Sequence, residues 1–305
     1  PGLVQPHRSS RTVDLRLSDR VQRIQPSPTL AVTARATELK AQGHDVIGLG
    51  AGEPDFTTPE PIRRAAMAAI DAGHTHYAPV DGIPSLKEAI RTKFQEDNGL
   101  AFSADQILVS CGGKQAVFNA ALALLQDGDE AIIPAPYWVS YPDIVRLTGA
   151  EPVIVPSGVD ADFKITAVQL AGALTERTRL VILNSPANPT GAVYTPEELA
   201  ALAEVLRGYP QGAILTDDIY EAIRFEDGPF TNILNVAPDL AQRTLVLNGV
   251  SKAFAMTGWR IGYAAGPAEV IGAMKKIQSQ STSGATTVSQ HAAEAALRGG
   301  HALIE

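Results

Sequence analysis

The residues best suited to chemistry are a lysine and several polar residues that follow apolar runs elsewhere in the chain. Lys252 comes shortly after the apolar run 244–248, which predicts a buried strand. A lysine held among apolar neighbours loses hydration, and this loss favours its neutral, nucleophilic form. A neutral lysine amine can form a Schiff base, so this segment indicates chemistry with an aldehyde cofactor. Without this context, a solvated surface amine would be the simpler interpretation.

A glycine pair between a predicted strand and a predicted helix indicates an anion site. Gly112 and Gly113 lie between the apolar run 107–110 and a helical pattern over 115–125. Glycines let the backbone approach a ligand closely, and a helix start presents free N–H groups, although a tight turn is the alternative interpretation. Lys114 in the first helical turn opposes the helix dipole at a cost of about 0.3–1 kcal/mol. This position indicates either a solvated side chain or a bound anion.

Two further polar clusters follow apolar runs. Pro186 and Pro189 fix the backbone around Asn188, although Asn-Pro-Thr-Gly is also a good turn sequence. Asp217 ends the apolar run 213–217, and a carboxylate buried there needs a cationic partner or a neutral form. A protonated pyridine nitrogen would be a suitable partner.

Short apolar runs alternate with helical patterns along the chain. Thr195, Pro196 and Glu198 form a helix-start signature, and Ser85 repeats it for a helix that ends near Asp97. Continuous apolar strands separated by helices predict a mostly parallel sheet covered on both faces. Ligands bind at the carboxyl ends of such strands, so the polar clusters should meet in one crevice. The expected strands are 107–110, 130–134, 152–155, 180–184, 213–217 and 244–248.

Composition narrows the function classes. The chain has 305 residues, is 45% apolar and has a net charge of −8, which argues against nucleic acid and anionic membrane as main partners. No apolar run approaches a membrane span, and no secretory leader opens the chain. Cys111 is the single cysteine, and we interpret it as a small buried residue in preference to a reactive thiol. A chain with one cysteine cannot form an intrachain disulfide, which predicts a reducing, cytoplasmic location. His74 and His76 lack a third ligand nearby in the sequence, so no metal is expected.

In order and spacing, these motifs resemble the fold type I pyridoxal-phosphate aminotransferases. The resemblance runs from about residue 17 to 280, and Gly-Gly-Lys-Gln-Ala at 112–116 is typical of the bacterial aspartate aminotransferases. The matching segments are Asn-x-Pro-x-Asn-Pro-Thr-Gly at 184–191, Asp-x-Ile-Tyr at 217–220, Ser-Lys-x-Phe-x-Met-x-Gly-x-Arg at 251–260, Gly-Glu-Pro-Asp-Phe at 52–56, Tyr-Ala-Pro at 77–79 and Pro-Tyr-Trp-Val-Ser-Tyr at 136–141.

The resemblance implies a three-layer α/β fold. A large pyridoxal-phosphate domain at 56–285 would contain a mostly parallel, seven-stranded sheet. A smaller domain would be built from the two chain ends, with 17–55 as its N-terminal segment and 286–305 as the incomplete start of its C-terminal part. Residues 1–16 would be a flexible arm or a cloning remnant.

The resemblance also implies residue roles. Lys252 would hold pyridoxal 5'-phosphate as an internal aldimine and then move a proton from the substrate Cα, while Asp217 would keep the pyridine nitrogen protonated. Tyr220 would hydrogen-bond the ring hydroxyl together with Asn188. The other cofactor-binding residues would be Trp138 on the ring, Gly112, Gly113, Lys114, Ser251 and Arg260 at the phosphate, and Tyr77 from the neighbouring subunit of a homodimer. Substrate would meet Gly52, Trp138, Asn188 and the Lys114 side chain, which would bind its distal carboxylate.

The chain departs from the family pattern at two points. Gly249 stands where many relatives have a serine three residues before the lysine, so one phosphate hydroxyl is missing. The family's C-terminal arginine, which grips the substrate α-carboxylate, has no counterpart by motif, because the chain ends before its place. If 305 residues were the whole protein, we would expect cofactor binding with severely weakened transamination.

The implied function is reversible, ping-pong transfer of an amino group from aspartate to 2-oxoglutarate, which gives oxaloacetate and glutamate. A prephenate or aromatic amino-acid aminotransferase of the same subgroup is the alternative. A lyase or synthase of the same fold also stays open. A non-catalytic, pyridoxal-phosphate-binding module of a transcription regulator fits less well, because residues 1–16 are too few for a DNA-binding domain and the net charge is acidic.

Overall fold

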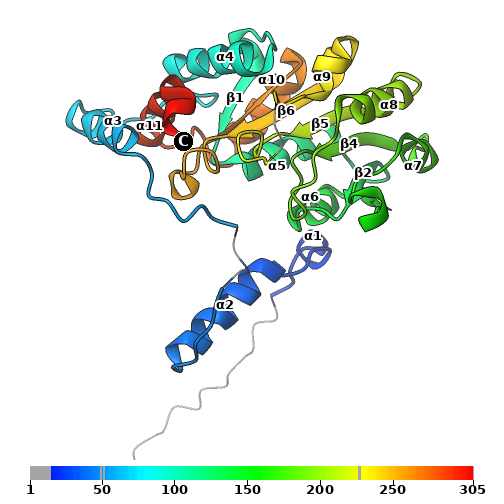
Figure 1. Cartoon of the computed structure of the whole chain (residues 1–305), viewed down its shortest axis with the longest axis horizontal. Coiled ribbons are helices and arrows are strands. Elements are labelled where there is room, and N and C mark those ends of the chain that lie inside the picture. The colour runs from blue at the N-terminus through cyan, green and yellow to red at the C-terminus, as the bar shows by residue number, and fades with distance from the viewer. Residues whose placement is uncertain (1–14, 49, 51, 226–227, 305) are drawn as a thin grey trace, which may run out of the picture.

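The computed structural model describes residues 15–48, 50, 52–225 and 228–304. Its centre is one seven-stranded sheet with helices on both faces (Figure 1). The strand order is β1-β7-β6-β5-β4-β2-β3, and β7 runs antiparallel to both of its neighbours while the other described pairs are parallel. The strands are β1 (Ile107–Ser110), β2 (Glu130–Ala135), β3 (Glu151–Pro156), β4 (Thr178–Asn184), β5 (Ala213–Asp217), β6 (Thr244–Gly249) and β7 (Gly262–Ala265).

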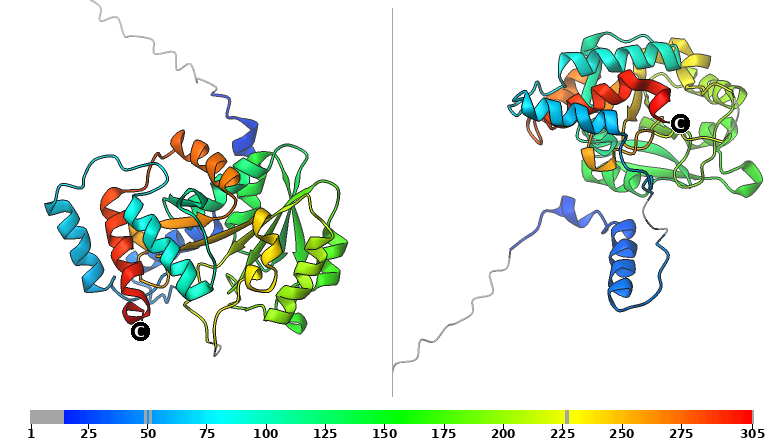
Figure 2. Two further views of the ribbon diagram at one scale, coloured as in Figure 1. Left: turned by 90° about the horizontal axis from the view of Figure 1, so that it is seen from above. Right: turned by 60° about the vertical axis from the view of Figure 1, so that its left-hand side comes forward.

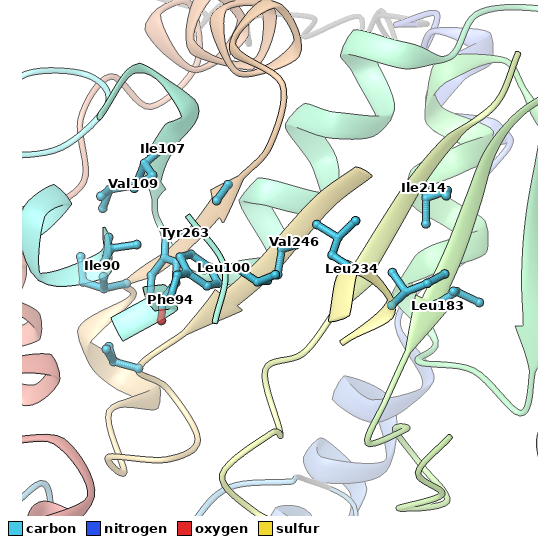
Figure 3. Close-up of a cluster of buried hydrophobic side chains, with 14 of the residues drawn as sticks. Ile90, Phe94, Leu100, Ile107, Val109, Leu183, Ile214, Leu234, Val246 and Tyr263 are labelled. Carbon is cyan, nitrogen blue, oxygen red and sulfur yellow. The ribbon is translucent and has the colours of Figure 1, made fainter. Parts of the chain in front are cut away.

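The sheet separates two hydrophobic clusters, because successive strand residues point to opposite faces. Val109 and Val246 belong to one cluster, whereas their neighbours Leu108 and Leu247 belong to the other. Figure 3 shows the first cluster, in which Phe94 meets the sheet. The covering helices are α4 (Pro84–Asn98), α7 (Ala167–Ala173), α8 (Pro196–Arg207), α9 (Ile233–Val236) and α11 (Thr287–Gly299) on that face, and α5 (Gly113–Leu124), α6 (Ser140–Thr148) and α10 (Ala268–Ser279) on the other.

The predicted three-layer, mostly parallel sheet is confirmed. All six strands expected from apolar runs are present, with ends shifted by two residues at most. The seventh strand, β7, contains Gly262-Tyr263-Ala264-Ala265 and has no branched apolar run that a pattern could detect.

Of the two helix N-caps predicted from the sequence, one is confirmed and one is wrong. Thr195 caps α8 as predicted, because its hydroxyl accepts from the Glu198 N–H. The cap predicted at Ser85 is wrong: α4 begins at Pro84 after Ile83. The Ser85 hydroxyl instead donates to Glu294 of α11 over 2.6 Å. The Ser85 hydroxyl is therefore used in a long-range contact with α11 and does not cap α4.

The N-terminal elements pack differently from the rest. Helices α1 (Asp19–Gln22) and α2 (Pro28–Ala41) contain no buried residue. In Figures 1 and 2, α2 lies outside the sheet and its covering helices. By contrast, α3 (Glu60–Asp71) packs against α11, whose Ala292 and Ala296 are fully buried. The predicted domain limits at 55 and 286 stay predictions.

Candidate active site

The carboxyl ends of three neighbouring strands bring the predicted polar clusters together. Asn184 ends β4 and Asp217 ends β5, and these two residues are paired in register. The Asn184 Nδ2 also donates to the Asp217 carbonyl over 2.8 Å. Lys252 follows the end of β6 in the next position of the sheet. The polar clusters that follow these three strands therefore lie side by side at this edge of the sheet.

Asp217 is the buried anionic centre of the site, with 5% of its surface exposed. Its carboxylate accepts from the Tyr141 hydroxyl over 2.7 Å and from the Ile219 N–H over 3.3 Å. Burial raises the pKa of Asp217 to about 6, against the lowering effect of these two hydrogen bonds. Within the described residues no cationic side chain pairs with this carboxylate. It is therefore ready to receive a cationic N–H group from a ligand.

Lys252 lies at the same edge of the sheet. Its Nζ donates to the Gly52 carbonyl over 2.5 Å and lies 5.7 Å from the centre of the Tyr220 ring. Burial lowers the pKa of Lys252, the Glu53 carboxylate raises it and Arg260 lowers it, with a lowered pKa as the result. This result agrees with the loss of hydration expected from the sequence, and it favours a nucleophilic amine.

The proline-rich loop positions Asn188 beside Tyr220. The Asn188 N–H donates to the Asn184 Oδ1 over 2.8 Å, which fixes the start of the loop. The Asn188 Nδ2 then donates to the Tyr220 hydroxyl over 3.3 Å. Burial and the charge of Asp217 raise the pKa of Tyr220. The two side chains thus present adjacent polar groups to a ligand near Lys252.

A cradle for an anion lies at the start of α5. Gly112 has φ +84°, and a Cβ there would come within 2.4 Å of an Arg260 guanidinium nitrogen. The first turn of α5 has no side-chain cap, so its free N–H groups and Arg260 face the same space. Ser251 is 5% exposed, and its hydroxyl has no hydrogen bond to any described residue. These donors suit a phosphate group.

Close glycine packing explains the departure at Gly249. A Cβ on Gly249 would lie 3.2 Å from the Gly262 Cα and the Ile261 carbonyl. A Cβ on Gly262 would in turn lie 2.2 Å from the Gly113 N. The missing serine hydroxyl therefore coincides with a tight contact between β6, β7 and the start of α5.

Lys114 and Trp138 line the outer part of the site. The Lys114 Nζ lies 4.9 Å from the Trp138 ring centre, and Trp138 meets Tyr141 edge to face at 5.2 Å. Burial, followed by the charge of Arg260, lowers the pKa of Lys114. Lys114 has no acidic partner among the described residues. A cavity of about 500 Å³ beside it is also lined by Ser27, Phe118, Val139 and Leu147.

Gly52 and Tyr77 were predicted site residues, whereas Tyr141 was not. Gly52 contacts Lys252 as described, but Tyr77 is fully exposed and has no hydrogen bond to the described site. Its predicted role in a neighbouring subunit stays a prediction. Tyr141, which bonds Asp217, was part of a matched segment but received no role. Its signal was only the position in that motif, since the contact joins residues far apart in the sequence.

The histidines near Tyr77 have a different environment from a metal site. His74 packs against His291 with ring centres 4.4 Å apart. In the described part of the chain, no three His, Cys, Asp or Glu side chains gather closely enough to hold a metal ion. Likewise, no helix there has the length and apolarity to cross a membrane.

The donor set fits one cofactor and defines a class of protein. A buried carboxylate, a deprotonatable lysine and a phosphate cradle at a parallel sheet's edge are the requirements of a pyridoxal-phosphate enzyme of fold type I. When bound, pyridoxal phosphate supplies an aldehyde for the covalent link and a ring that accepts electrons from the substrate Cα. Asp217 would hold the ring nitrogen, the α5 cradle and Arg260 the phosphate, and Lys252 would move the Cα proton.

Comparisons with known proteins place the chain in a family. Residues 44–304 match the model of aminotransferase class I and II. The chain is 59% identical to the aspartate/prephenate aminotransferase of Nitrosomonas europaea over 93% of its own length and 72% of that protein. It resembles the aspartate aminotransferase of Rhizobium meliloti (TM-score 0.91, 49% identity, 93% and 71% of the two chains). The Thermus thermophilus enzyme solved with maleate is similar (TM-score 0.90, 46% identity, 95% and 74%).

The chain therefore belongs to the class I and II aminotransferases, and it is an enzyme that uses pyridoxal phosphate. It spans 71–74% of the length of these three relatives.

Proposed function

We propose that the protein transfers the amino group of aspartate to 2-oxoglutarate. The observation that supports this most strongly is Lys114, an exposed cation whose Nζ lies over Trp138, whose pKa is lowered by its surroundings and which has no acidic partner among the described residues. Partial desolvation and the nearby Arg260 disfavour the charged form of Lys114, and the distal carboxylate of a dicarboxylic substrate would supply the opposite charge that stabilises it. The relatives named above are called aspartate or aspartate/prephenate aminotransferases, and one was solved with the dicarboxylate maleate.

The test compares amino donors on the wild-type protein and a Lys114→Met variant. We expect the wild type to prefer aspartate over leucine, and Lys114→Met to lower kcat/KM for aspartate by about tenfold to a thousandfold while that for leucine changes little. Lys276→Met is the matched control, because Lys276 is exposed on α10 and has no ion pair among the described residues. Equal losses for both donors in Lys114→Met would contradict the assignment.

Prephenate is a second candidate substrate, since the Nitrosomonas relative is named for it. The supporting observation here is the cavity of about 500 Å³ beside Lys114, whose apolar lining includes Phe118 and Leu147. Such a wall would accommodate a ring that aspartate lacks. We expect Leu147→Trp to reduce kcat/KM for prephenate more than for aspartate in parallel steady-state assays. An equal reduction for both substrates would contradict the proposal that this cavity binds the ring of prephenate.

We also propose a homodimer in which Tyr77 contacts the cofactor phosphate of the other subunit. Tyr77 is fully exposed, yet the neighbouring His76 carbonyl accepts from Thr287 over 2.8 Å, so the loop is held in place. An exposed aromatic side chain on an anchored loop is suited to an interface. Sedimentation should show a dimer, and Tyr77→Phe should release the cofactor more readily on dilution. A fully active monomer would exclude this arrangement.

Two further proposals concern the domain organisation and the location of the protein. We propose that 56–285 form the large domain and that 17–55 contribute to a smaller one, which the absence of buried residues in α2 supports. A cytoplasmic location is proposed from the single cysteine, which is not part of a disulfide. Limited proteolysis that cuts between α2 and α3 before any other site would support the proposed boundary.

A further inference from the structure

A short segment of the chain lies along the loop that contains Lys252. We call residues 52–58 the linker segment, because they connect α2 to α3 (Figure 2). Three residues of the linker segment form hydrogen bonds with the lysine loop, residues 252–259. The contacts are Lys252 Nζ to the Gly52 carbonyl at 2.5 Å, Thr257 Oγ1 to Glu53 Oε1, and Thr58 Oγ1 to the Ala255 carbonyl at 2.6 Å.

Thr58 differs from its neighbours in this segment. It is 8% exposed, whereas Thr57 is exposed and Phe56 is 79% exposed. Its hydroxyl donates to the Ala255 carbonyl and also accepts from the Trp259 Nε1–H over 3.0 Å. One hydroxyl therefore joins the linker segment to two parts of the lysine loop.

The lysine loop needs such support at Ala255. This residue has φ +50°, in the left-handed region that costs a non-glycine residue roughly 1–2 kcal/mol. Residues in such conformations persist when surrounding contacts hold them. The hydrogen bond from Thr58 holds the Ala255 carbonyl in this conformation.

The other end of the linker segment meets Lys252. Gly52 and Glu53 are exposed, and their contacts among the described residues are with Lys252 and Thr257. The Gly52 carbonyl and the Glu53 carboxylate favour a charged Lys252, whereas burial and Arg260 favour a neutral one. The Tyr220 ring also faces this amine. The placement of the linker segment therefore affects the protonation of Lys252.

We propose that Thr58 is a positioning residue for Lys252, because it fixes the linker segment so that the Gly52 carbonyl contacts the free amine while the Glu53 carboxylate, held by Thr257, stays within range of its charge. Loss of the Thr58 hydroxyl frees the segment and removes two groups that favour the charged lysine. The pKa of Lys252 then falls further. The proposal concerns the free lysine and is independent of which amino donor the enzyme uses.

The experiment measures the reactivity of Lys252 in the full chain freed of cofactor. Pulses of acetic anhydride between pH 6 and pH 10, followed by peptide mass mapping, give the labelling rate of Lys252 relative to exposed Lys276. Thr58→Val should move the labelling curve to lower pH and raise the relative rate near pH 7 about threefold. Thr57→Val, the matched control, should behave as the wild type, and Thr58→Ser should restore the wild-type curve.

A wild-type labelling curve in a folded Thr58→Val protein, or an equal shift in Thr57→Val, would overturn the proposal. Glu53→Gln provides a second variant that keeps an acceptor for Thr257 but removes the charge. It should also shift the labelling curve, because it removes a charge that favours protonated Lys252 while it leaves the Thr58 hydrogen bonds in place. A Glu53→Gln protein with an unchanged curve would equally contradict the coupling. Because no amino donor is used, these outcomes leave the aspartate reaction untouched.

Discussion

The cofactor side and the N-terminal side of the site are held by different physical means. Asp217, Asn184 and the glycines at the start of α5 lie at strand ends, where buried hydrogen bonds and tight backbone contacts determine their positions. Gly52 and Glu53 are exposed and are held by hydrogen bonds with the lysine loop, while α2 contains no buried residue. The difference teaches that the groups for the cofactor are preorganised by the sheet. The N-terminal groups, Gly52 and Glu53, are instead positioned by a few hydrogen bonds that single substitutions can remove.

The largest effect should come from the cofactor side. Lys252→Ala removes the group that forms the covalent link and moves the Cα proton, so we expect kcat/KM to fall by at least about a thousandfold. Borohydride reduction followed by peptide mapping should give a pyridoxyl adduct on Lys252 in the wild type and none at this position in the variant. An adduct on another lysine of the wild type would show that the site is wrongly placed.

The next largest effect should be on stability, at the buried ion pair between Lys93 and Glu221. Lys93 on α4 pairs with Glu221, which follows Tyr220, and both side chains are about 10% exposed. Removing one partner leaves a buried charge alone, so Lys93→Met should lower the free energy of unfolding by about 3–5 kcal/mol. Urea unfolding measures this.

The control for Lys93→Met is the double variant Lys93→Met/Glu221→Gln. It removes the charge of Glu221 together with that of Lys93 and should recover much of the lost stability. If the double variant is as unstable as the sum of the single ones, the pair does not act as a unit.

Asp217 allows a prediction with opposite signs for activity and stability. Its pKa of about 6 lies above the ordinary 3.8, so the folded protein without cofactor binds this proton more tightly than the unfolded chain does. The contribution of Asp217 to stability is therefore present at low pH, falls as pH rises from about 4 to 6, and is an unfavourable one above that range.

We expect Asp217→Asn to be more stable than the wild type without cofactor by about 1–3 kcal/mol at pH 8, with the difference vanishing near pH 4. Its kcat should fall by about a hundredfold or more, because the ring nitrogen loses its anionic partner. Thermal unfolding at several pH values and steady-state rates provide the two measurements. A variant less stable than the wild type at pH 8 would mean that burial does not dominate at this carboxyl.

Features of the fold and the site that depend on neighbouring residues could be predicted from the sequence, whereas contacts between residues far apart in the sequence could not. Strand ends and the Thr195 cap are local patterns, and Lys252, Asp217 and Asn188 were singled out because they follow apolar runs, whereas the role of Tyr220 came from the family resemblance. The wrong cap at Ser85 reflects long-range contacts that local patterns do not contain. The same holds for the bonds of Tyr141 and Thr58, whose partners lie 76 and about 200 residues away.

The smallest effect should be found on α2, and it tests the comparison directly. Leu30 is 71% exposed on α2, whereas Leu202 is 1% exposed on α8. Leu202→Ala should cost about 2–5 kcal/mol of unfolding free energy, because it leaves a cavity in the core. Leu30→Ala should change it by less than about 0.5 kcal/mol, since no buried surface is lost. If Leu30→Ala is instead costly, α2 is covered in solution by a surface outside the described residues, and the N-terminal side of the site is held as firmly as the cofactor side.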